Sequence, residues 1–337
     1  SGTMKKYYFD DEPLKVFGVP YFEKTKKFIR LPEDLRNALK GEYPDLGRRC
    51  AGARVGFRTD STEFTVKMEL EKLTPDMGMS AFAAQSAEVI IGSRQNGRYA
   101  GHVNPPNYST TAFEKTFKKD SSIEDIMIFL PRNEHVVNLE VLVNDGAVVE
   151  APTPYKYQKP ILYYGSSITE GGCCCRVTNA YNAIISNHLD VDYYNFGFSG
   201  SARGELIMAE YISGIDMSIF VMDYDHNAPS AQHLRETHRP FYELIRKKNP
   251  DLPIIMMSAP DFDYAEDKAE RRAIIKDTYE QAVKCGDKNV YFLDGETFFG
   301  KKDRHFCTVD CTHPNDLGFY RMAQVIEPVI SKILTGF

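Results

Sequence analysis

Several features are scarce or missing in this 337-residue chain, and each absence narrows the class of protein. No tryptophan is present, which excludes a tryptophan clamp from any binding site. No apolar run is long enough for a membrane-spanning helix, and acidic residues from Asp10 to Glu12 interrupt any apolar signal-peptide core near the N-terminus. The formal net charge of −6 comes without a long Lys/Arg cluster, so neither nucleic acid nor an anionic membrane is expected as a partner.

Cysteine number and spacing indicate the cellular compartment. The seven cysteines are an odd count, and three are consecutive, unlike the spaced cysteines of small disulfide-bonded folds: Cys173, Cys174 and Cys175. We therefore expect a reducing, cytoplasmic location. We interpret the three adjacent thiols as small buried side chains, because three neighbours in sequence cannot all face one ion. A second group also lacks the paired spacing of a zinc site, so no metal is predicted there: His305, Cys307, Cys311 and His313.

The first part of the chain has the alternating pattern of half-buried β-strands. Every second residue is apolar in two segments and is expected to face the core: Phe64, Val66, Met68 and Leu70 in one, and Val137, Leu139, Val141 and Val143 in the other. Further short strands are expected at 55–59, 88–91 and 123–130, between loops rich in Gly, Pro and Asn. Residues 5–150 are therefore predicted to form an antiparallel, jelly-roll-like β-sandwich.

A proline-rich stretch at 151–160 is the predicted linker, and a different pattern follows it from 161 to 337. Short apolar strands alternate with helical segments, at 161–164, 191–196, 217–223, 253–257 and 290–293. This alternation predicts an α/β domain in which a five-stranded parallel sheet lies between two helical layers. The helix after the first strand is expected to start at Thr178, as N-cap, and the last helix at Pro314.

Ligands of parallel sheets bind outside the carboxyl ends of the strands, and polar residues gather at these positions. Ser167 follows the first strand of the predicted sheet, and a hydroxyl needs an adjacent base to become a nucleophile. Near the C-terminus, Asp310 precedes His313 by three residues, which allows the carboxylate to hold one ring nitrogen while the other faces the serine. Gly200 and Asn227 follow the second and third strands and are candidate donors to an oxyanion.

In this order, the four segments resemble the conserved blocks of the SGNH (GDSL-like) hydrolases. The resemblance implies that Ser167 is the nucleophile, that Asp310 and His313 complete its triad, and that the Ser167 N–H, Gly200 and Asn227 form the oxyanion hole. Ser166 stands where the family usually has an acidic residue, as in a subgroup with Ser or Thr at that position. No metal or organic cofactor is implied.

A β-sandwich ahead of such a domain resembles carbohydrate esterase family two and related acetyl esterases. The resemblance implies hydrolysis of a short acyl ester, acetyl above all, on a carbohydrate. Two alternatives remain open at this point: a lysophospholipase or thioesterase for longer acyl chains, and a non-catalytic glycan-binding protein that uses its sandwich. The oligomeric state also stays open.

Other side chains near the predicted strand ends are candidates for substrate contact. Arg176 follows the predicted nucleophile, and Arg203 follows the predicted oxyanion glycine. Asp261 and Phe262 follow the fourth strand. In the sandwich, the loop at 96–107 is a candidate for reaching the active site.

Overall fold

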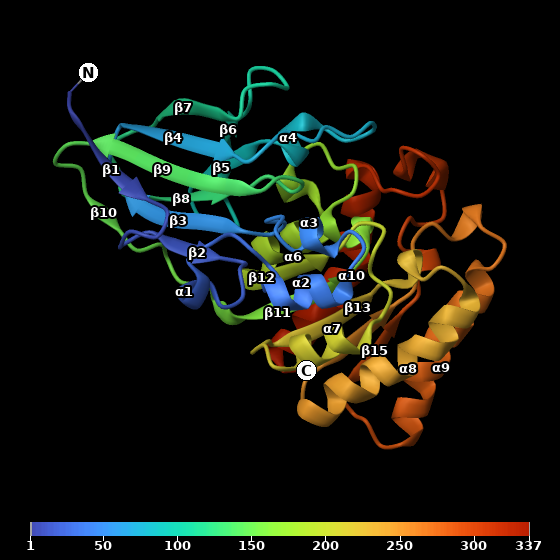
Figure 1. Ribbon diagram of the computed structural model, residues 1–337. Helices are drawn as coiled ribbons and strands as arrows, with labels where there is room; N and C mark the ends of the chain where they lie inside the picture. Colours follow the sequence, from blue (N-terminus) through green and yellow to red (C-terminus); the bar gives the residue numbers. More distant parts are fainter. Residues whose placement is uncertain (1, 337) are drawn as a thin grey trace.

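The computed structural model describes residues 2–336, apart from the side chain of Tyr264, and its two domains pack side by side (Figure 1). The N-terminal domain contains two antiparallel sheets. In the first, the strand order is β1 (Met4–Tyr8), β9 (Val136–Asn144), β4 (Glu63–Leu70), β7 (Ala112–Lys118). In the second, it is β10 (Val149–Glu150), β3 (Arg54–Thr59), β8 (Glu124–Phe129), β5 (Ala87–Ile91), β6 (Arg98–Val103), and β2 (Lys15–Phe17) pairs with β3. The short helices of this domain are α1 (Phe22–Thr25), α2 (Glu33–Leu39), α3 (Tyr43–Leu46) and α4 (Ala81–Ala84).

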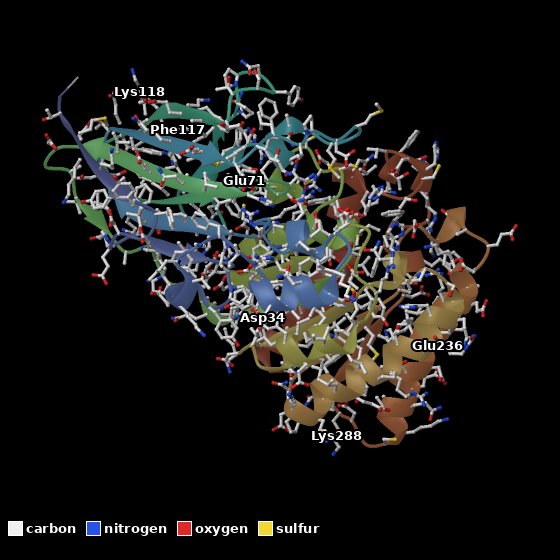
Figure 2. The ribbon with its side chains drawn as sticks, in the orientation of Figure 1. Asp34, Glu71, Phe117, Lys118, Glu236 and Lys288 are labelled. Atoms are coloured by element: carbon white, nitrogen blue, oxygen red, sulfur yellow. The ribbon has the colours of Figure 1, made fainter. Side chains whose placement is uncertain are left out.

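Alternating apolar side chains hold the two antiparallel sheets together. The predicted inward face of β4 is buried as expected, from Phe64 at 0% exposure to Leu70 at 2%. In β7, Phe117 packs into the same core, whereas its neighbour Lys118 extends into solvent (Figure 2). The predicted β-sandwich is thus confirmed.

One residue of the predicted inward face of β9 points the other way. The pairing of β9 with β4 shifts between Glu69 and Leu70, so that Leu70 lies opposite Val136. This irregularity inserts an extra residue in β9, and a one-residue slip exchanges the two faces of a strand. Val136 is therefore buried and Val137 is exposed, contrary to the sequence-based expectation.

The C-terminal domain contains the predicted five-stranded parallel sheet. Its strand order is β12 (Val191–Gly197), β11 (Tyr157–Gly165), β13 (Ile219–Asp223), β14 (Ile254–Met257), β15 (Val290–Leu293). One face packs against α6 (Tyr181–Leu189) and α10 (Asp316–Thr335), and the other against α7 (Leu206–Ser213), α8 (Ala231–Lys248) and α9 (Lys268–Lys284). Consecutive residues of β11 serve the two cores in turn, since Tyr163 belongs to one and Tyr164 to the other. The three-layer α/β/α prediction is confirmed.

Short one-turn elements complete this domain and lie between its strands and helices. They are α5 (Ser167–Glu170), η1 (Val177–Asn179), η2 (Asp225–Asn227), η3 (Phe262–Tyr264), η4 (Gly295–Thr297) and η5 (Arg304–Cys307). None of the helices within residues 2–336 is both long and apolar enough to span a membrane.

Two helix starts differ from those expected. The N-cap of α6 is Ala180, and Thr178 instead lies in η1, where its hydroxyl donates a hydrogen bond to the buried carboxylate of Glu88 at 2.6 Å. Helix α10 begins after Asn315, whose side-chain oxygen accepts the N–H of Gly318 at 3.0 Å. An asparagine that satisfies a free amide of the first turn is a better helix start than Pro314, which has no side-chain acceptor.

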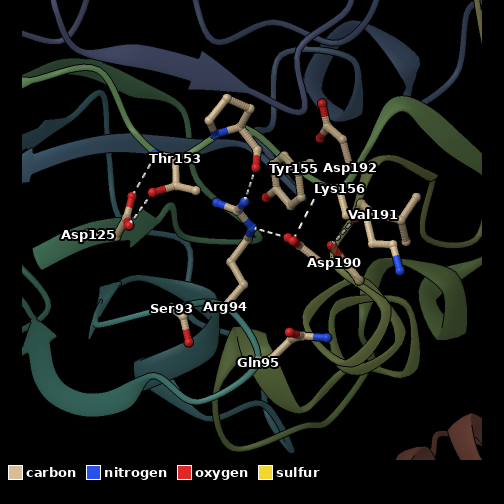
Figure 3. Close-up of polar contacts among 12 residues, drawn as sticks. Ser93, Arg94, Gln95, Asp125, Thr153, Tyr155, Lys156, Asp190, Val191 and Asp192 are labelled. Atoms are coloured by element: carbon tan, nitrogen blue, oxygen red, sulfur yellow. Dashed lines mark hydrogen bonds and ion pairs between the residues drawn. The ribbon is translucent and has the colours of Figure 1, made fainter.

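The segment between the domains is held by polar contacts on both sides (Figure 3). Strand β11 begins at Tyr157, so the predicted linker of 151–160 overlaps it. Arg94, from the loop between β5 and β6, donates to the Asp190 carboxylate at 2.5 Å and to the carbonyl of Pro154 at 2.8 Å. The other carboxylate oxygen of Asp190 accepts the N–H of Lys156 at 3.2 Å.

Candidate active site

The predicted polar residues meet at the carboxyl edge of the parallel sheet. Ser167 follows β11, Gly200 follows β12 and Asn227 follows β13, while Asp310 and His313 lie in the loop before α10. Because the three strands are parallel neighbours, their ends share one edge of the sheet.

The turn that carries Ser167 depends on close packing beneath it. A Cβ at Gly165 would lie 2.1 Å from the Thr169 hydroxyl and 2.2 Å from the Asp223 carbonyl, so only glycine allows this approach. Ser166 is fully buried and caps α5, its hydroxyl accepting the Ile168 N–H at 3.1 Å. The serine in the place of the usual acidic residue therefore has a structural role as a helix cap.

Ser167, His313 and Asp310 form a continuous chain of hydrogen bonds. Ser167 Oγ lies 2.9 Å from His313 Nε2, and His313 Nδ1 lies 2.7 Å from Asp310 Oδ2. Asp310 Oδ1 also accepts the backbone N–H groups of His313 at 2.7 Å and Thr312 at 3.1 Å. With Nδ1 donating to the carboxylate, Nε2 is left to accept the serine proton.

The charge on Asp310 is favoured by these same contacts. Partial burial acts to raise the pKa of Asp310, but the hydrogen bonds from His313 and Thr312 and the charge of the His313 ring outweigh it. The pKa of Asp310 therefore lies below its usual range, and the carboxylate stays ionised beside the imidazole.

Three donors face the same edge without acceptors of their own. Gly200 has φ +70° and open space around its Cα, and Asn227 Oδ1 accepts the Ala202 N–H at 3.2 Å, which leaves the amide NH₂ free. Among the described residues, neither this NH₂ nor the N–H groups of Ser167 and Gly200 donate within the protein. Free donors at the same sheet edge as a serine are what a tetrahedral oxyanion requires.

Replacing Asn227 by alanine tests this arrangement. Loss of one oxyanion donor is expected to lower kcat for nitrophenyl acetate by about 10²- to 10³-fold while KM changes little, because the donor acts on charge that develops in the transition state. Steady-state kinetics at saturating ester measure it. An unchanged kcat would contradict the assignment of Asn227 to the oxyanion site.

The sandwich domain supports the loop that carries Gly200. The buried guanidinium of Arg30 donates to the carbonyls of Asn195 at 2.8 Å and Gly197 at 2.7 Å, and the Tyr43 hydroxyl donates to the Ser201 carbonyl at 2.9 Å. Burial lowers the pKa of Arg30 to about 10, which still leaves it charged at neutral pH. Neither residue belongs to a sequence motif, so their contribution is visible only in the tertiary structure.

Buried carboxylates hold the turn that carries Ser167. Glu170 accepts the Ser199 N–H at 2.7 Å and so ties α5 to the Gly200 loop. Asp223, at the end of β13, accepts the hydroxyls of Thr169 at 2.8 Å and Tyr181 at 2.7 Å. Burial raises the pKa of Asp223 to about 7, despite these hydrogen bonds.

Family comparison agrees with this geometry. The sequence pattern of the GDSL-like lipase/acylhydrolase family matches residues 158–331, more than half of the chain. The chain belongs to this family. Residues 7–149 of the hydrolase match a second pattern, GxDLY, described as the N-terminus of Esterase SGNH hydro-type. No curated protein matches the sequence.

Solved structures resemble the hydrolase over both domains. A protein from Bacteroides ovatus described as a GDSL-like lipase is 26% identical, with a TM-score of 0.88 over 99% of this chain and 98% of the other. A salicylyl-acyltransferase from a tetracycline biosynthetic pathway is 20% identical, with a TM-score of 0.79 over 98% and 97%. A family two carbohydrate esterase from Cellvibrio japonicus is 13% identical, with a TM-score of 0.66 over 99% and 98%. The last two similarities concern the fold.

The two arginine candidates of this hydrolase lie differently with respect to the site. The Arg176 guanidinium stacks 4.3 Å from the ring centre of Tyr99, and its Nε lies 3.4 Å from the buried Glu88 carboxylate. Arg176 thus faces the sandwich. Tyr99 lies in strand β6, so the loop expected at 96–107 is in large part a strand that pairs with β5. Arg203 is exposed beyond Gly200. Within the described part of the chain, only its backbone makes hydrogen bonds, including one from His233 at 2.8 Å.

The two adjacent candidates after β14 make different contacts. The guanidinium of Arg272 lies over Phe262, 4.7 Å from the centre of the phenyl ring. The Asp261 side chain is only 4% exposed and lies 3.0 Å from Lys268 Nζ and 3.4 Å from Nδ1 of His226. Asp261 therefore contacts His226, which lies next to Asn227. His226 was not among the candidates predicted from the sequence.

The three consecutive cysteines are not all buried as expected. Cys174 is buried, Cys173 is partly exposed and Cys175 is exposed, because successive side chains of an irregular loop point in different directions. Within residues 2–336, no three His, Cys, Asp or Glu side chains gather closely enough to hold a metal ion.

Proposed function

We propose that this GDSL-like hydrolase is a serine esterase that removes short acyl groups, acetyl above all, from carbohydrates. The observation that carries the proposal is the hydrogen-bonded chain from Ser167 through His313 to Asp310, beside three free donors. A serine with an oriented base and an oxyanion site is the arrangement for acyl transfer through an acyl-enzyme.

In the acylation step, Ser167 Oγ attacks the ester carbonyl carbon and its proton passes to His313 Nε2. The carbonyl oxygen becomes an oxyanion beside the N–H groups of Ser167 and Gly200 and the amide of Asn227. Collapse of this intermediate breaks the ester bond, and His313 donates the proton to the departing sugar oxygen, which leaves as a hydroxyl. Asp310 stays ionised throughout and stabilises the imidazolium form of His313.

In the deacylation step, water replaces the alcohol. Its oxygen attacks the acyl carbon, one of its protons passes to His313 Nε2, and the same donors stabilise the oxyanion. The acid then leaves while Ser167 recovers its proton from His313. The cycle uses side chains of this chain and water.

The carbohydrate assignment rests on the architecture of both domains. The similarity to a family two carbohydrate esterase extends over the sandwich as well as the parallel sheet. The segment between β2 and β3 of the N-terminal domain contacts the loop of Gly200 through Arg30 and Tyr43, a connection that an isolated binding module would not need.

A series of nitrophenyl esters tests the acyl chain length. We expect kcat/KM for the acetate to exceed that for the octanoate and decanoate by about tenfold or more, since a site shaped for a short acyl group discriminates against extra methylenes. Mass spectrometry of acetylated xylan, mannan, pectin and free sugar acetates then identifies the deacetylated product. A preference for decanoate would favour the lysophospholipase or thioesterase alternative, and glycan binding without hydrolysis of any ester would favour the binding protein.

A further inference from the structure

A second imidazole–carboxylate pair lies beside the triad. The ring of His226 contacts the ring of His313, with 5.8 Å between centroids and 79° between planes. His226 Nδ1 lies 3.4 Å from Asp261 Oδ2, and the other oxygen of Asp261 lies 3.0 Å from Lys268 Nζ. A series of contacts thus extends from Lys268 in α9 through Asp261 and His226 to the catalytic histidine.

The burial of the charged pair Asp261 and Lys268 indicates a function other than stabilising the fold. The side chains of Asp261 and Lys268 are 4% and 8% exposed, and removing two charges from water costs free energy that their attraction does not always recover. The carboxylate is aimed at His226, whose side chain is 21% exposed at the edge of the site. Buried charges arranged around a partly accessible histidine in an active site are typical of functional groups.

The backbone that carries His226 is anchored rigidly. Arg271, from α9, donates to the carbonyls of Asp225 at 2.9 Å and Ala228 at 2.8 Å, on both sides of His226. The Asp225 carboxylate in turn accepts the Ala259 N–H at 2.8 Å. His226 and its neighbour Asn227 are therefore positioned together.

The nearby Asp261 carboxylate favours one tautomer of His226. A neutral imidazole with Asp261 at Nδ1 carries its proton there and leaves Nε2 as an acceptor, the same arrangement that Asp310 gives His313. The 3.4 Å separation from Asp261 is longer than a hydrogen bond, as is common for catalytic groups before substrate binds. Two acceptors that share one water lie about 4.5 Å apart, given hydrogen bonds of about 2.8 Å. The 5.8 Å between the ring centres is compatible with such a water.

We propose that His226 orients the water that hydrolyses the acyl-enzyme, with Asp261 as the residue that positions its ring. The attacking water directs one O–H to His313 Nε2, which takes that proton as the C–O bond forms. Its second O–H donates a hydrogen bond to His226 Nε2 and keeps its proton, which leaves with the carboxylic acid. The inference rests on the acyl-enzyme of the proposed function, and it assigns His226 to deacylation alone.

Rapid mixing with nitrophenyl acetate separates the two steps. In H226L, acylation is expected to stay within about threefold of wild type while deacylation falls by about 10- to 100-fold, the usual cost of losing orientation of a reactant. Nitrophenol release then shows a burst, and the acetylated protein accumulates and is detected by mass spectrometry. H226Q, whose side-chain oxygen can accept the same hydrogen bond, is expected to recover part of the deacylation rate.

Methanol as competing nucleophile distinguishes water orientation from general damage. Methanol has a single O–H, which goes to His313, so methanolysis does not need His226. The ratio of methyl acetate to acetate is therefore expected to rise in H226L by the same factor by which hydrolysis falls. D261N is expected to shift this ratio in the same direction, by a smaller factor.

The matched control is H188Q, which disrupts another imidazole–carboxylate pair, on the outer face of α6. His188 Nδ1 lies 2.6 Å from Glu327, and its side chain is 50% exposed. H188Q is expected to leave the burst and the ratio unchanged. Equal slowing of methanolysis and hydrolysis in H226L, or wild-type deacylation, would overturn the role of His226. Absence of ester hydrolysis by the wild-type protein, with no acetylated protein formed, would instead overturn the proposed function.

Discussion

Ser167→Ala is expected to lower kcat for nitrophenyl acetate by about 10⁴- to 10⁶-fold, the largest effect of any single substitution in this protein. The variant has no hydroxyl to form the acyl-enzyme, and the remaining rate over uncatalysed hydrolysis comes from the oxyanion donors and substrate binding. Steady-state kinetics measure the rate, and mass spectrometry after mixing with substrate checks that no acetylated protein forms.

The fold is expected to survive this change. The Ser167 hydroxyl makes one hydrogen bond, to His313, so its removal is expected to alter the free energy of unfolding by about 1 kcal/mol or less. Ser331→Ala, in the last helix and far from the sheet edge, is the control for loss of a serine hydroxyl and is expected to keep full activity. Substantial turnover by folded Ser167→Ala would reject the nucleophile.

Asp310→Asn has the second largest expected effect, about 10²- to 10⁴-fold in kcat. An asparagine can still accept the backbone N–H groups of Thr312 and His313 through its oxygen. Its NH₂ then faces His313 Nδ1, which favours the proton on Nε2 and removes the acceptor for Ser167. The carboxylate that stabilises the imidazolium is lost as well.

The pH dependence follows from the sign of the Asp310 shift. The pKa of Asp310 in the folded protein lies below the usual range for aspartate. The carboxylate is therefore still ionised at a pH in that usual range, and it is protonated only as the pH falls through the lowered pKa. Protonation of Asp310 is therefore not expected to limit wild-type activity near neutral pH. The control for Asp310→Asn is Asp303→Asn, just before η5, since Asp303 already has the left-handed conformation that asparagine tolerates. Wild-type kcat in Asp310→Asn would contradict the role of this carboxylate.

Local features could be read directly from the chain. The alternation in β4 predicted its buried face, and the repeated strand–helix pattern predicted the three-layer domain. Both depend on the period of side chains along one element, which the sequence contains in full. The order of polar residues after successive strands also placed Ser167, Gly200 and Asn227 at one edge, because parallel neighbours end on the same side.

Deviations from the local pattern came from contacts between distant segments. Val137 was expected inside, but the shifted pairing with β4 buries Val136 instead. Thr178 has the side chain of a helix cap, yet it hydrogen-bonds to Glu88 across the domain interface. When a side chain has two possible hydrogen-bond partners, the tertiary fold decides which of them lies within reach.

The sequence by itself therefore determined the family, the two kinds of sheet and the order of the residues around Ser167, because each is encoded by spacing along the chain. Only the tertiary structure decided which other side chains hold the residues around Ser167 in place. Arg30 reaches the loop of Gly200 from another domain, and Asp261 contacts His226 from a neighbouring strand end. Such contacts join residues far apart in sequence, and the free energy of burying a charge is defined only once the fold has surrounded it.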